Sequence, residues 1–376
     1  MIEIQPPLDR AILVSAPVRG SYDEHHAHEH LDELERLTDT AGADVVGRVT
    51  QRIAKMSPKA LIGPGKLVEL TELVTAKDAT LVIFDHELTP AQGKNLEHAL
   101  DVRVMDRTEL ILDIFATRAR TNEAKMQVEL AQLKYLLPRL ARMWTHLSRI
   151  RGGIGLRGPG ETQIETDRRL IRRRISKLKN KLGDVERHRG VVRQGQRRRG
   201  VLRAALVGYT NAGKSSLLRA FSGADVLVEN RLFATLDTVA REVFVPPAGK
   251  IRLIDTVGFI RKLPHDLVAS FKATLEEATH ADVLLHVIDA SHPDWEEQVA
   301  VVDRALADLD LNGPRVVHVF NKMDRVCDRA AFESRARHQY EEAVFVAVTA
   351  PAIDELKRKF AALVNGTVAR ATRAAG

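Results

Sequence analysis

Short apolar runs alternate with amphipathic stretches through residues 1–120. The continuous apolar segments have the length of buried strands, and the stretches between them carry apolar residues at helical spacing. Thr89-Pro90 marks a helix start, because threonine suits the N-cap and proline suits the first turn. This alternation predicts an α/β domain with a mainly parallel sheet. The predicted strands lie at 11–14, 45–49, 81–84 and 102–105, and the predicted helices at 28–41, 66–75, from 90 and from 108.

Between residues 121 and 189 the pattern changes to that of long helices. Pro138 interrupts the first run and should kink or divide that helix. A second helix is predicted over 161–189, with one narrow apolar seam on a surface otherwise rich in Arg and Lys. Residues 152–160 are too glycine-rich for regular structure, so we predict an antiparallel helical hairpin with a Gly-rich tip and a basic linker at 193–199. The apolar positions are Leu130, Leu133, Leu137, Leu140 and Trp144 in the first helix, and Ile164, Ile171, Ile175, Leu178, Leu182 and Val185 in the second.

Strands and helices alternate again after residue 201, and a short Ala/Arg tail follows. Strands are predicted near 203–207, 241–246, 251–254, 283–288, 316–320 and 343–348. The predicted organisation is an N-terminal α/β domain at 1–120, the hairpin with its basic linker at 121–200, a second α/β domain at 201–365 and a tail at 366–376.

The composition excludes several classes of protein. No apolar run approaches the length of a membrane-spanning helix, and the N-terminal residues are neither basic nor followed by an apolar signal core. Cys327 is the only cysteine, so an intrachain disulfide is impossible and a reducing compartment fits. We expect a cytoplasmic monomer without a membrane span.

The net charge of +7 is concentrated in one segment. Residues 151–203 hold 17 Lys and Arg against 5 Asp and Glu, a local charge of +12, so the rest of the chain carries −5. Such a segment could bind a polyanion, because neutralising phosphates releases counterions. A solvated helix face would have the same composition, and charge alone does not separate the two interpretations.

One octapeptide has the form G-x-x-x-x-G-K-[ST]: Gly208-Tyr209-Thr210-Asn211-Ala212-Gly213-Lys214-Ser215. It lies between a predicted strand and a predicted helix, where successive backbone N–H groups and the helix dipole bind phosphate. Lys214 should reach the outer phosphates and act in catalysis, and the Ser215 hydroxyl should coordinate Mg²⁺. The motif predicts a nucleoside triphosphate site and leaves the base open.

Two tetrapeptides narrow the choice of base. Asp255-Thr256-Val257-Gly258 follows a predicted strand, where an Asp facing Mg²⁺ and a Gly N–H that contacts the γ-phosphate are expected. Asn321-Lys322-Met323-Asp324 follows the next-but-one strand, and its Asp can accept both N1–H and the exocyclic amine of guanine. Three motifs in this order predict a P-loop GTPase (Ras-like) domain that binds GTP and GDP.

Two further loops complete the predicted site. Phe233-Ala234-Thr235-Leu236-Asp237 lies where a switch loop is expected, and Thr235 should be the second hydroxyl on Mg²⁺. Thr238 is better explained as a helix or turn cap. Val346-Ala347-Val348 should supply a backbone N–H to the guanine oxygen.

Phe259 stands where many GTPases place a glutamine that orients the attacking water. Phenylalanine cannot make that hydrogen bond, so we predict slow intrinsic turnover that a bound cation, a partner surface or a rearranged switch accelerates. Asn211 is a candidate K⁺ ligand, and a loop-shaping hydrogen bond is an equally good explanation for it.

Two features resemble sites only superficially. Gly63-Pro64-Gly65-Lys66 lacks the spacing of a phosphate loop, and we interpret it as a turn. His25, His26, His28 and His30 lack a metal-ligand pattern, and we interpret them as a polar loop that enters a helix.

Taken together, the segment GGIGLRGPGETQIE at 152–165, the octapeptide, FATLD at 233–237 and DTVGF at 255–259 resemble the HflX family of ribosome-associated GTPases. The resemblance implies binding to the large ribosomal subunit, with the hairpin tip near the peptidyl-transferase centre, and splitting of stalled or stressed ribosomes in the GTP state. It also implies ATP hydrolysis by the N-terminal region, for which Gly63–Lys66 offers no clear site. The sequence departs from the family at 346–348 and in its short C-terminal extension. The residues expected to contact ribosomal RNA are Arg151, Gly152, Gly153, Arg157, Gly158, Arg168, Arg169, Arg172 and Arg173.

Other functions stay open at this stage. A GTP- or ATP-dependent RNA-remodelling or RNA-modifying enzyme would need a cofactor fold or a nucleophilic cysteine, and Cys327, three residues beyond Asp324, is poorly placed for that role. A signalling adaptor would use the hairpin to bind another protein helix. A fourth hypothesis assigns the main chemistry to ATP turnover in the N-terminal domain.

Overall fold

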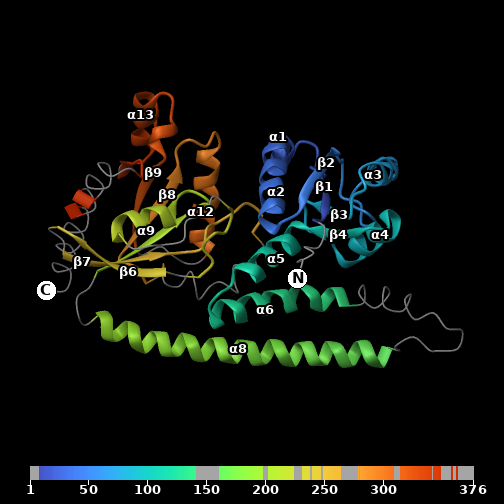
Figure 1. The fold of residues 1–376 in the computed structure, drawn as a ribbon, viewed down its shortest axis with the longest axis horizontal. Coiled ribbons are helices and arrows are strands. Elements are labelled where there is room, and N and C mark those ends of the chain that lie inside the picture. The colour runs from blue at the N-terminus through green and yellow to red at the C-terminus, as the bar shows by residue number, and fades with distance from the viewer. Residues whose placement is uncertain are drawn as a thin grey trace, which may run out of the picture. The chain divides into compact units, whose positions relative to one another are not determined.

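The computed structural model describes residues 8–140, 161–197, 202–223, 231–237, 239–246, 249–263, 278, 280–308, 314–340, 342–348, 357–358 and 361–362 (Figure 1). The chain divides into two compact units, one of residues 1–117 and 128–180 and the other of residues 118–127 and 181–376. Each unit is described by itself. The predicted division into domains at 120, 200 and 365 stays a prediction.

The first unit contains a four-stranded parallel sheet in the order β2-β1-β3-β4. Its central strands are buried on both faces, with Ile12, Val14, Val82 and Phe84 in one core cluster. This confirms the predicted α/β fold with a parallel sheet. The elements are β1 (Arg10–Ser15), α1 (Tyr22–His25), α2 (Ala27–Ala41), β2 (Asp44–Thr50), α3 (Pro64–Ala76), β3 (Leu81–Phe84), α4 (Pro90–Leu100), β4 (Arg103–Asp106) and α5 (Arg107–Arg118).

The helix start predicted at Thr89 is present with both halves of a capping box. The Thr89 side chain accepts a hydrogen bond from the Gln92 backbone, and the Gln92 side chain accepts one from the Thr89 backbone. Two backbone donors that the helix itself leaves unpaired are thereby satisfied.

Two local predictions in this unit are wrong. The segment at 63–66 is the start of α3 and not a turn, with Gly63 at the N-cap and Pro64 in the first turn. Proline is favoured there because the first helical residues need no backbone donor. The histidine-rich segment is helical and not a loop, since it lies in α1 and α2, and His30 is buried.

The predicted antiparallel hairpin is present in its described parts. Helix α6 (Asn122–Leu136) ends in the 3₁₀ turn η1 (Leu137–Arg139), where Pro138 stands, as expected for a proline-divided helix. Helix α8 (Glu161–Arg197) runs alongside it (Figure 1). Glu129 pairs with Arg174 at 2.6 Å and Glu123 with Arg189 at 2.6 Å, so the two helices run in opposite directions.

The predicted seam of α8 is the face that packs. Leu178 is buried, and Ile171, Ile175, Leu182 and Val185 are half-buried, whereas most of the intervening cations are exposed. The basic linker predicted at 193–199 is wrong in part, because α8 continues to Arg197. The predicted tip at 152–160 and Trp144 lie outside the described residues.

The second unit contains a six-stranded sheet in the order β10-β9-β8-β5-β7-β6. The strands are parallel except β6, which pairs antiparallel with β7. The carboxyl ends of β5, β7 and β9 therefore meet at one edge of the sheet, where open α/β folds bind ligands. The elements are β5 (Leu202–Gly208), α9 (Lys214–Ser222), β6 (Val239–Val245), β7 (Gly249–Asp255), β8 (Val283–Asp289), α12 (Trp295–Asp308), β9 (Arg315–Asn321), η2 (Met323–Arg325), α13 (Arg329–Gln339) and β10 (Ala343–Phe345).

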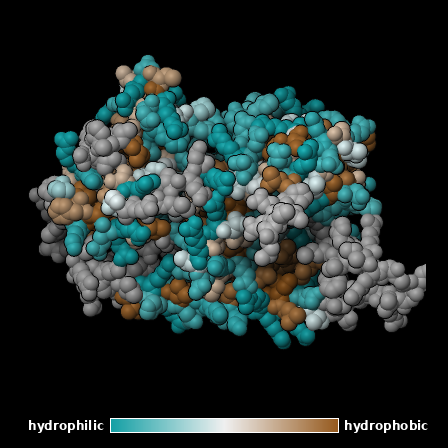
Figure 2. Space-filling model, viewed as in Figure 1, coloured by the Kyte–Doolittle hydropathy of each residue, from teal (hydrophilic) through white to brown (hydrophobic). Residues whose placement is uncertain are grey.

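The strand predicted at 343–348 ends earlier, at Phe345, so residues 346–348 are a loop. Among the described residues, no helix combines the length and the apolar character needed to cross a bilayer. The face in Figure 2 is largely hydrophilic, with hydrophobic residues in small groups.

Candidate nucleotide-binding site

The phosphate loop connects the end of β5 to the start of α9, and two of its glycines are required by close backbone contacts. Gly208 has φ 150°, and a Cβ there would lie 2.2 Å from the Val287 carbonyl oxygen. Gly213, the N-cap of α9, has φ 98°, and a Cβ there would lie 2.2 Å from the Asn321 side-chain nitrogen. Any side chain at either position would push the loop away from the neighbouring strands.

This loop borders a cavity of about 290 Å³. Among the described residues, four cations and no acidic side chain line it, so its electrostatic character suits a polyphosphate. The cationic residues are Lys214, Arg231, Lys322 and Arg325; the other lining residues are Thr210, Asn211, Gly213, Ser215, Ser216, Phe233, Ala234, Thr235, Thr256 and Gly258.

Lys214 is buried at the floor of the cavity. Its ammonium donates hydrogen bonds to the carbonyl oxygens of Gly208 at 3.1 Å and Tyr209 at 2.8 Å. Burial lowers the pKa of Lys214 to about 8, and the nearby carboxylate of Asp255 opposes this shift. The loop carbonyls thus hold the charged group next to the phosphate-binding backbone.

Three oxygen donors meet beside Lys214, and two of them are the predicted Mg²⁺ ligands. The Ser215 hydroxyl lies 2.7 Å from the Thr235 hydroxyl and donates to one oxygen of Asp255 at 2.6 Å. The other oxygen, Asp255 Oδ1, is buried and has no hydrogen-bond partner within the described part of the chain, and burial raises the pKa of this carboxyl. A buried carboxylate oxygen and two hydroxyls are the hard donors that Mg²⁺ prefers, so the residues fit this ion.

The switch loop is held against the phosphate loop through its backbone. Phe233 has φ 55° and a buried side chain, and its N–H donates to the Thr210 hydroxyl at 3.0 Å. Leu236 is buried as well, and Ala234 lines the cavity. These anchors on either side of Thr235 hold its hydroxyl beside that of Ser215.

Asp237, predicted to belong to the nucleotide site, has its carboxylate at the start of α6. It accepts hydrogen bonds from the Arg120 N–H at 3.0 Å, and from the backbone and hydroxyl of Thr121. The Thr121 hydroxyl in turn accepts from the Ala124 N–H at 3.1 Å. The switch loop therefore supplies part of the N-terminal cap of α6.

The loop after β7 lies directly under the phosphate loop. Thr256 donates from its hydroxyl to the Leu206 carbonyl at 2.7 Å, and a Cβ on Gly258 would lie 2.7 Å from the Thr210 Cα. The Phe259 N–H donates to the Gly208 carbonyl at 3.1 Å, and the Phe259 carbonyl accepts from the Thr210 N–H at 2.7 Å. Phe259 is 2% exposed, so its apolar ring is buried.

The predicted base-recognition residues lie together beyond the phosphate loop. Asn321 donates from its side-chain amide to the Ala212 carbonyl at 2.9 Å, and Lys322 donates to the Asn211 carbonyl at 2.9 Å and to Asp289 at 2.6 Å. The Met323 N–H donates to the Val346 carbonyl at 3.1 Å. Asp324 is exposed at this edge.

The loop at 346–348 therefore lies beside 321–324, where its predicted role places it. The Val346 N–H donates to the Phe320 carbonyl at 2.8 Å, which fixes the loop to the end of β9. Val346 and Ala347 are buried, and Val348 is 38% exposed.

Sequence reasoning missed three participants in this region. Arg231 and Arg325 line the cavity, and Asp289 holds Lys322. Arg325 directly follows Asp324, so its position could have indicated a residue of the site. A single charge next to a motif is usually solvated, however, and does not by itself predict a contact. Of the arginines predicted to contact RNA, Arg168 is half-buried, and Arg169, Arg172 and Arg173 are exposed on α8. Those at 151–158 lie outside the described residues.

Three protein-family models match consecutive parts of the chain. They are described as the N-terminal region of a GTP-binding GTPase at residues 28–116, its middle region at 118–197, and a 50S ribosome-binding GTPase at 203–322. The three matches cover most of the sequence.

The chain is also similar to curated proteins over most of its length. The chain is 53% identical to a GTPase HflX of Caldanaerobacter subterraneus subsp. tengcongensis over 86% of this chain and 74% of the relative. It is 47% identical to the GTPase HflX of Escherichia coli over 92% of this chain and 81% of the relative. A crystal structure of SsGBP with GDP superposes with a TM-score of 0.54 at 24% identity, covering 96% of this chain and 99% of that one, which shows a shared fold.

Proposed function

The chain belongs to the HflX family of GTPases, and from this premise we propose that it is a GTP-switched factor that binds the large ribosomal subunit and separates stalled or stressed ribosomes into subunits. GTP hydrolysis then releases the factor. The observation that carries the proposal is an exposed arginine surface on α8 in the same chain as a nucleotide site in which the Thr235 hydroxyl lies 2.7 Å from that of Ser215.

The GTP site supports the switching part of the proposal. Thr235, Ser215 and Asp255 converge on one point. These residues would hold Mg²⁺, which would supply positive charge to the β- and γ-phosphates. Lys214 would contact the outer phosphates, and the Thr235 hydroxyl would engage the metal ion only while the γ-phosphate is present. Loss of that phosphate would release the loop.

The hairpin supports the ribosomal part. On α8 the seam residues pack and the arginines at 169, 172 and 173 face solvent. Structured RNA is bound mainly through its backbone and shape, for which guanidinium groups are well suited because they contact phosphate bidentately. An exposed cationic helix face thus provides the chemistry that ribosomal RNA requires.

Sedimentation with purified ribosomes tests the proposal. With a non-hydrolysable GTP analogue, the full chain should co-sediment with large subunits at moderate salt and convert intact ribosomes to subunits. With GDP it should do neither, and ribosomes should raise its GTPase rate several-fold or more. Failure to bind large subunits in the analogue-bound state would exclude this function. Binding that resists RNase treatment would favour a protein partner for the hairpin.

Neutralising the α8 arginines should weaken ribosome binding and flatten its salt dependence. We expect replacement of Arg168, Arg169, Arg172 and Arg173 by glutamine to reduce the slope of log affinity against log salt by about one for each phosphate that the protein no longer neutralises. The measurement is co-sedimentation across a salt series.

A matched control removes four positive charges away from the hairpin, at the exposed residues Arg241, Lys250, Arg304 and Arg329. This variant should bind ribosomes with nearly unchanged slope. Equal slopes in both variants would mean that net charge alone determines binding.

The monovalent cation provides a separate prediction for the phosphate loop. Asn211 has φ 61°, lines the cavity and has its carbonyl engaged by Lys322. If its side chain coordinates K⁺ next to the phosphates, GTP hydrolysis should be faster in KCl than in NaCl, and Asn211→Ala should remove the difference. Equal rates of the unaltered chain in the two salts would leave Asn211 with only its loop-shaping role.

A further inference from the structure

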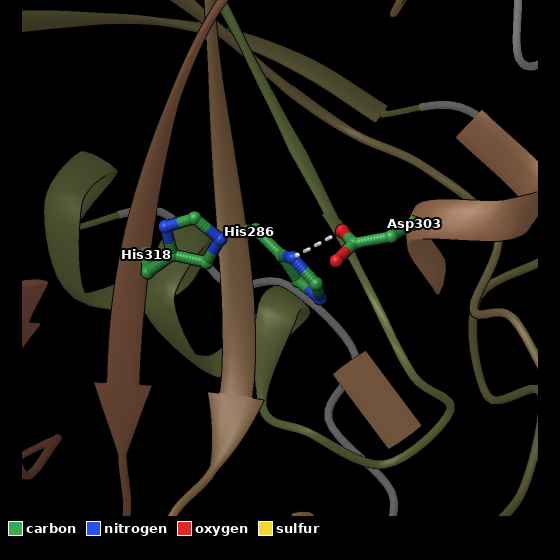
Figure 3. A group of neighbouring side chains, drawn as sticks. All are labelled: His286, Asp303 and His318. Atoms are coloured by element: carbon green, nitrogen blue, oxygen red, sulfur yellow. Dashed lines mark ion pairs between the residues drawn. The ribbon is translucent and has the colours of Figure 1, made fainter. Parts of the chain in front are cut away.

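Two histidines and one aspartate converge in the second unit, away from the nucleotide cavity. His286 on β8 and His318 on β9 are direct register partners, so both side chains project from the same face of the sheet. Asp303 projects toward them from α12 (Figure 3). One ligand atom from each of the three residues lies within 4.8 Å of the others, the only such group found among the described residues.

The central member of this group is a buried donor or acceptor without a partner. The His286 side chain is 1% exposed, and its Nδ1 has no hydrogen-bond partner among the described residues. That nitrogen lies 3.6 Å from Asp303 Oδ1, the contact dashed in Figure 3, which is too long for a hydrogen bond. Buried polar atoms are almost always satisfied, so an unsatisfied nitrogen aimed at a carboxylate calls for an explanation.

Both imidazoles are in the form that binds metal. Burial lowers the pKa of His286 to about 3 and the pKa of His318 to about 4. A neutral imidazole offers a nitrogen lone pair to a metal ion.

We propose that His286, His318 and Asp303 bind a Zn²⁺ ion. Two imidazole nitrogens and one carboxylate form a three-ligand set that zinc commonly takes, with water in the fourth position. Asp303 is 51% exposed in its side chain, so ion and water can enter from its side. Mg²⁺ prefers oxygen ligands and would not be selected here, which separates this site from the one at Ser215, Thr235 and Asp255.

The geometry needs only a small adjustment for this ion. Ligand atoms around a tetrahedral zinc with bonds of 2.0–2.1 Å lie about 3.4 Å apart, against the limit of 4.8 Å in the present arrangement. His286 and Asp303 are already at 3.6 Å. The His318 ring, which packs on Tyr340 with centroids 4.2 Å apart, would have to approach by rotation about its side-chain bonds.

The bound ion would connect β8, β9 and α12. Strand β9 ends at Asn321, and β8 ends at Asp289, which holds Lys322. Zinc would therefore stabilise the two strands that carry the base-recognition loop. Zinc binding at this site would not require the ribosome.

Zinc titration of the full-length, chelator-treated and nucleotide-free protein tests the site. Competition with a chromophoric chelator should show tight binding at one site, and zinc should raise the melting temperature whereas magnesium should not. Asp303→Asn and His318→Gln should each weaken zinc binding by about tenfold or more. Because Asp303 is half-exposed, its variant should fold even if a histidine variant does not.

The matched control is Asp308→Asn, which removes the same charge from an exposed position on the same helix and should leave zinc affinity unchanged. Co²⁺ in place of zinc should give the visible absorption of a tetrahedral complex, and Asp303→Asn should alter that spectrum. The proposal is overturned if Asp303→Asn binds zinc as tightly as the unaltered chain, if Asp308→Asn loses as much affinity, or if His28→Gln removes the binding instead.

Discussion

Replacing Lys214 with alanine should abolish measurable GTP binding, a loss of at least about 100-fold or about 2.8 kcal/mol. The ammonium lies at the floor of the cavity, where it donates to the carbonyls of Gly208 and Tyr209. Lys322, the other lysine among the described lining residues, lies at the base-recognition end and cannot replace it. Its loss removes charge-assisted hydrogen bonds to two phosphates. Titration of a fluorescent GTP analogue measures the effect.

Lys66 provides a matched control, because it follows the sequence Gly-Pro-Gly and belongs to the start of α3. Its ammonium pairs with Glu69 at 2.6 Å on the surface. Lys66→Ala should leave GTP affinity and ATP turnover unchanged. A large loss of GTP affinity or of ATP turnover in this variant would indicate that the N-terminal region binds nucleotide.

Replacing Asp324 with asparagine should shift the base preference from guanine toward xanthine. The carboxylate is exposed beside the loop at 346–348, where it can accept from both N1–H and the exocyclic amine of guanine. Asparagine offers one acceptor and one donor, so guanine loses a hydrogen bond and xanthine, with a carbonyl in place of the amine, gains one. We expect GTP affinity to fall by about tenfold or more, as for loss of a hydrogen bond to a charged group.

Competition between GTP and XTP measures this preference. Asp328→Asn is the matched control, since Asp328 caps α13 through the Ala331 N–H at 3.0 Å and asparagine caps equally well. That variant should keep its guanine preference. Unchanged GTP affinity in Asp324→Asn would contradict the assignment of this residue.

Most of the fold followed from local sequence patterns. Apolar runs located the strands, except the end of β10, within a residue or two, and the seam of α8 separated its packed face from its cationic face. These predictions succeeded because strand burial and helix amphipathicity are set by neighbours along the chain. The phosphate loop was predictable from its local motif, although the contacts that require Gly208 and Gly213 come from Val287 on β8 and Asn321 on β9.

The errors came from interactions that the local pattern does not contain. Helix α8 continues to Arg197 although the sequence there is rich in like charges, which the local pattern suggested as a linker. The segment at 63–66 starts a helix because its glycine and proline suit a helix N-terminus as well as a turn. The pairing of His286 with His318 depends on strand register, which no spacing in the sequence reveals.

The hydrogen bonds that Asp237 accepts from Arg120 and Thr121 link the stability of the α6 cap to the switch loop. Asp237 is two residues from Thr235, so the chain can separate them by only about 7 Å, and a displacement of the threonine must move the carboxylate. Capping interactions of this kind contribute about 1 kcal/mol. Linkage is reciprocal. If GTP stabilises this cap more than GDP does, then formation of the cap raises the affinity for GTP relative to GDP by the same factor. Any change that disorders or orders the first turn of α6 would therefore change the affinity for GTP relative to GDP by the factor with which the nucleotide changes the stability of the cap.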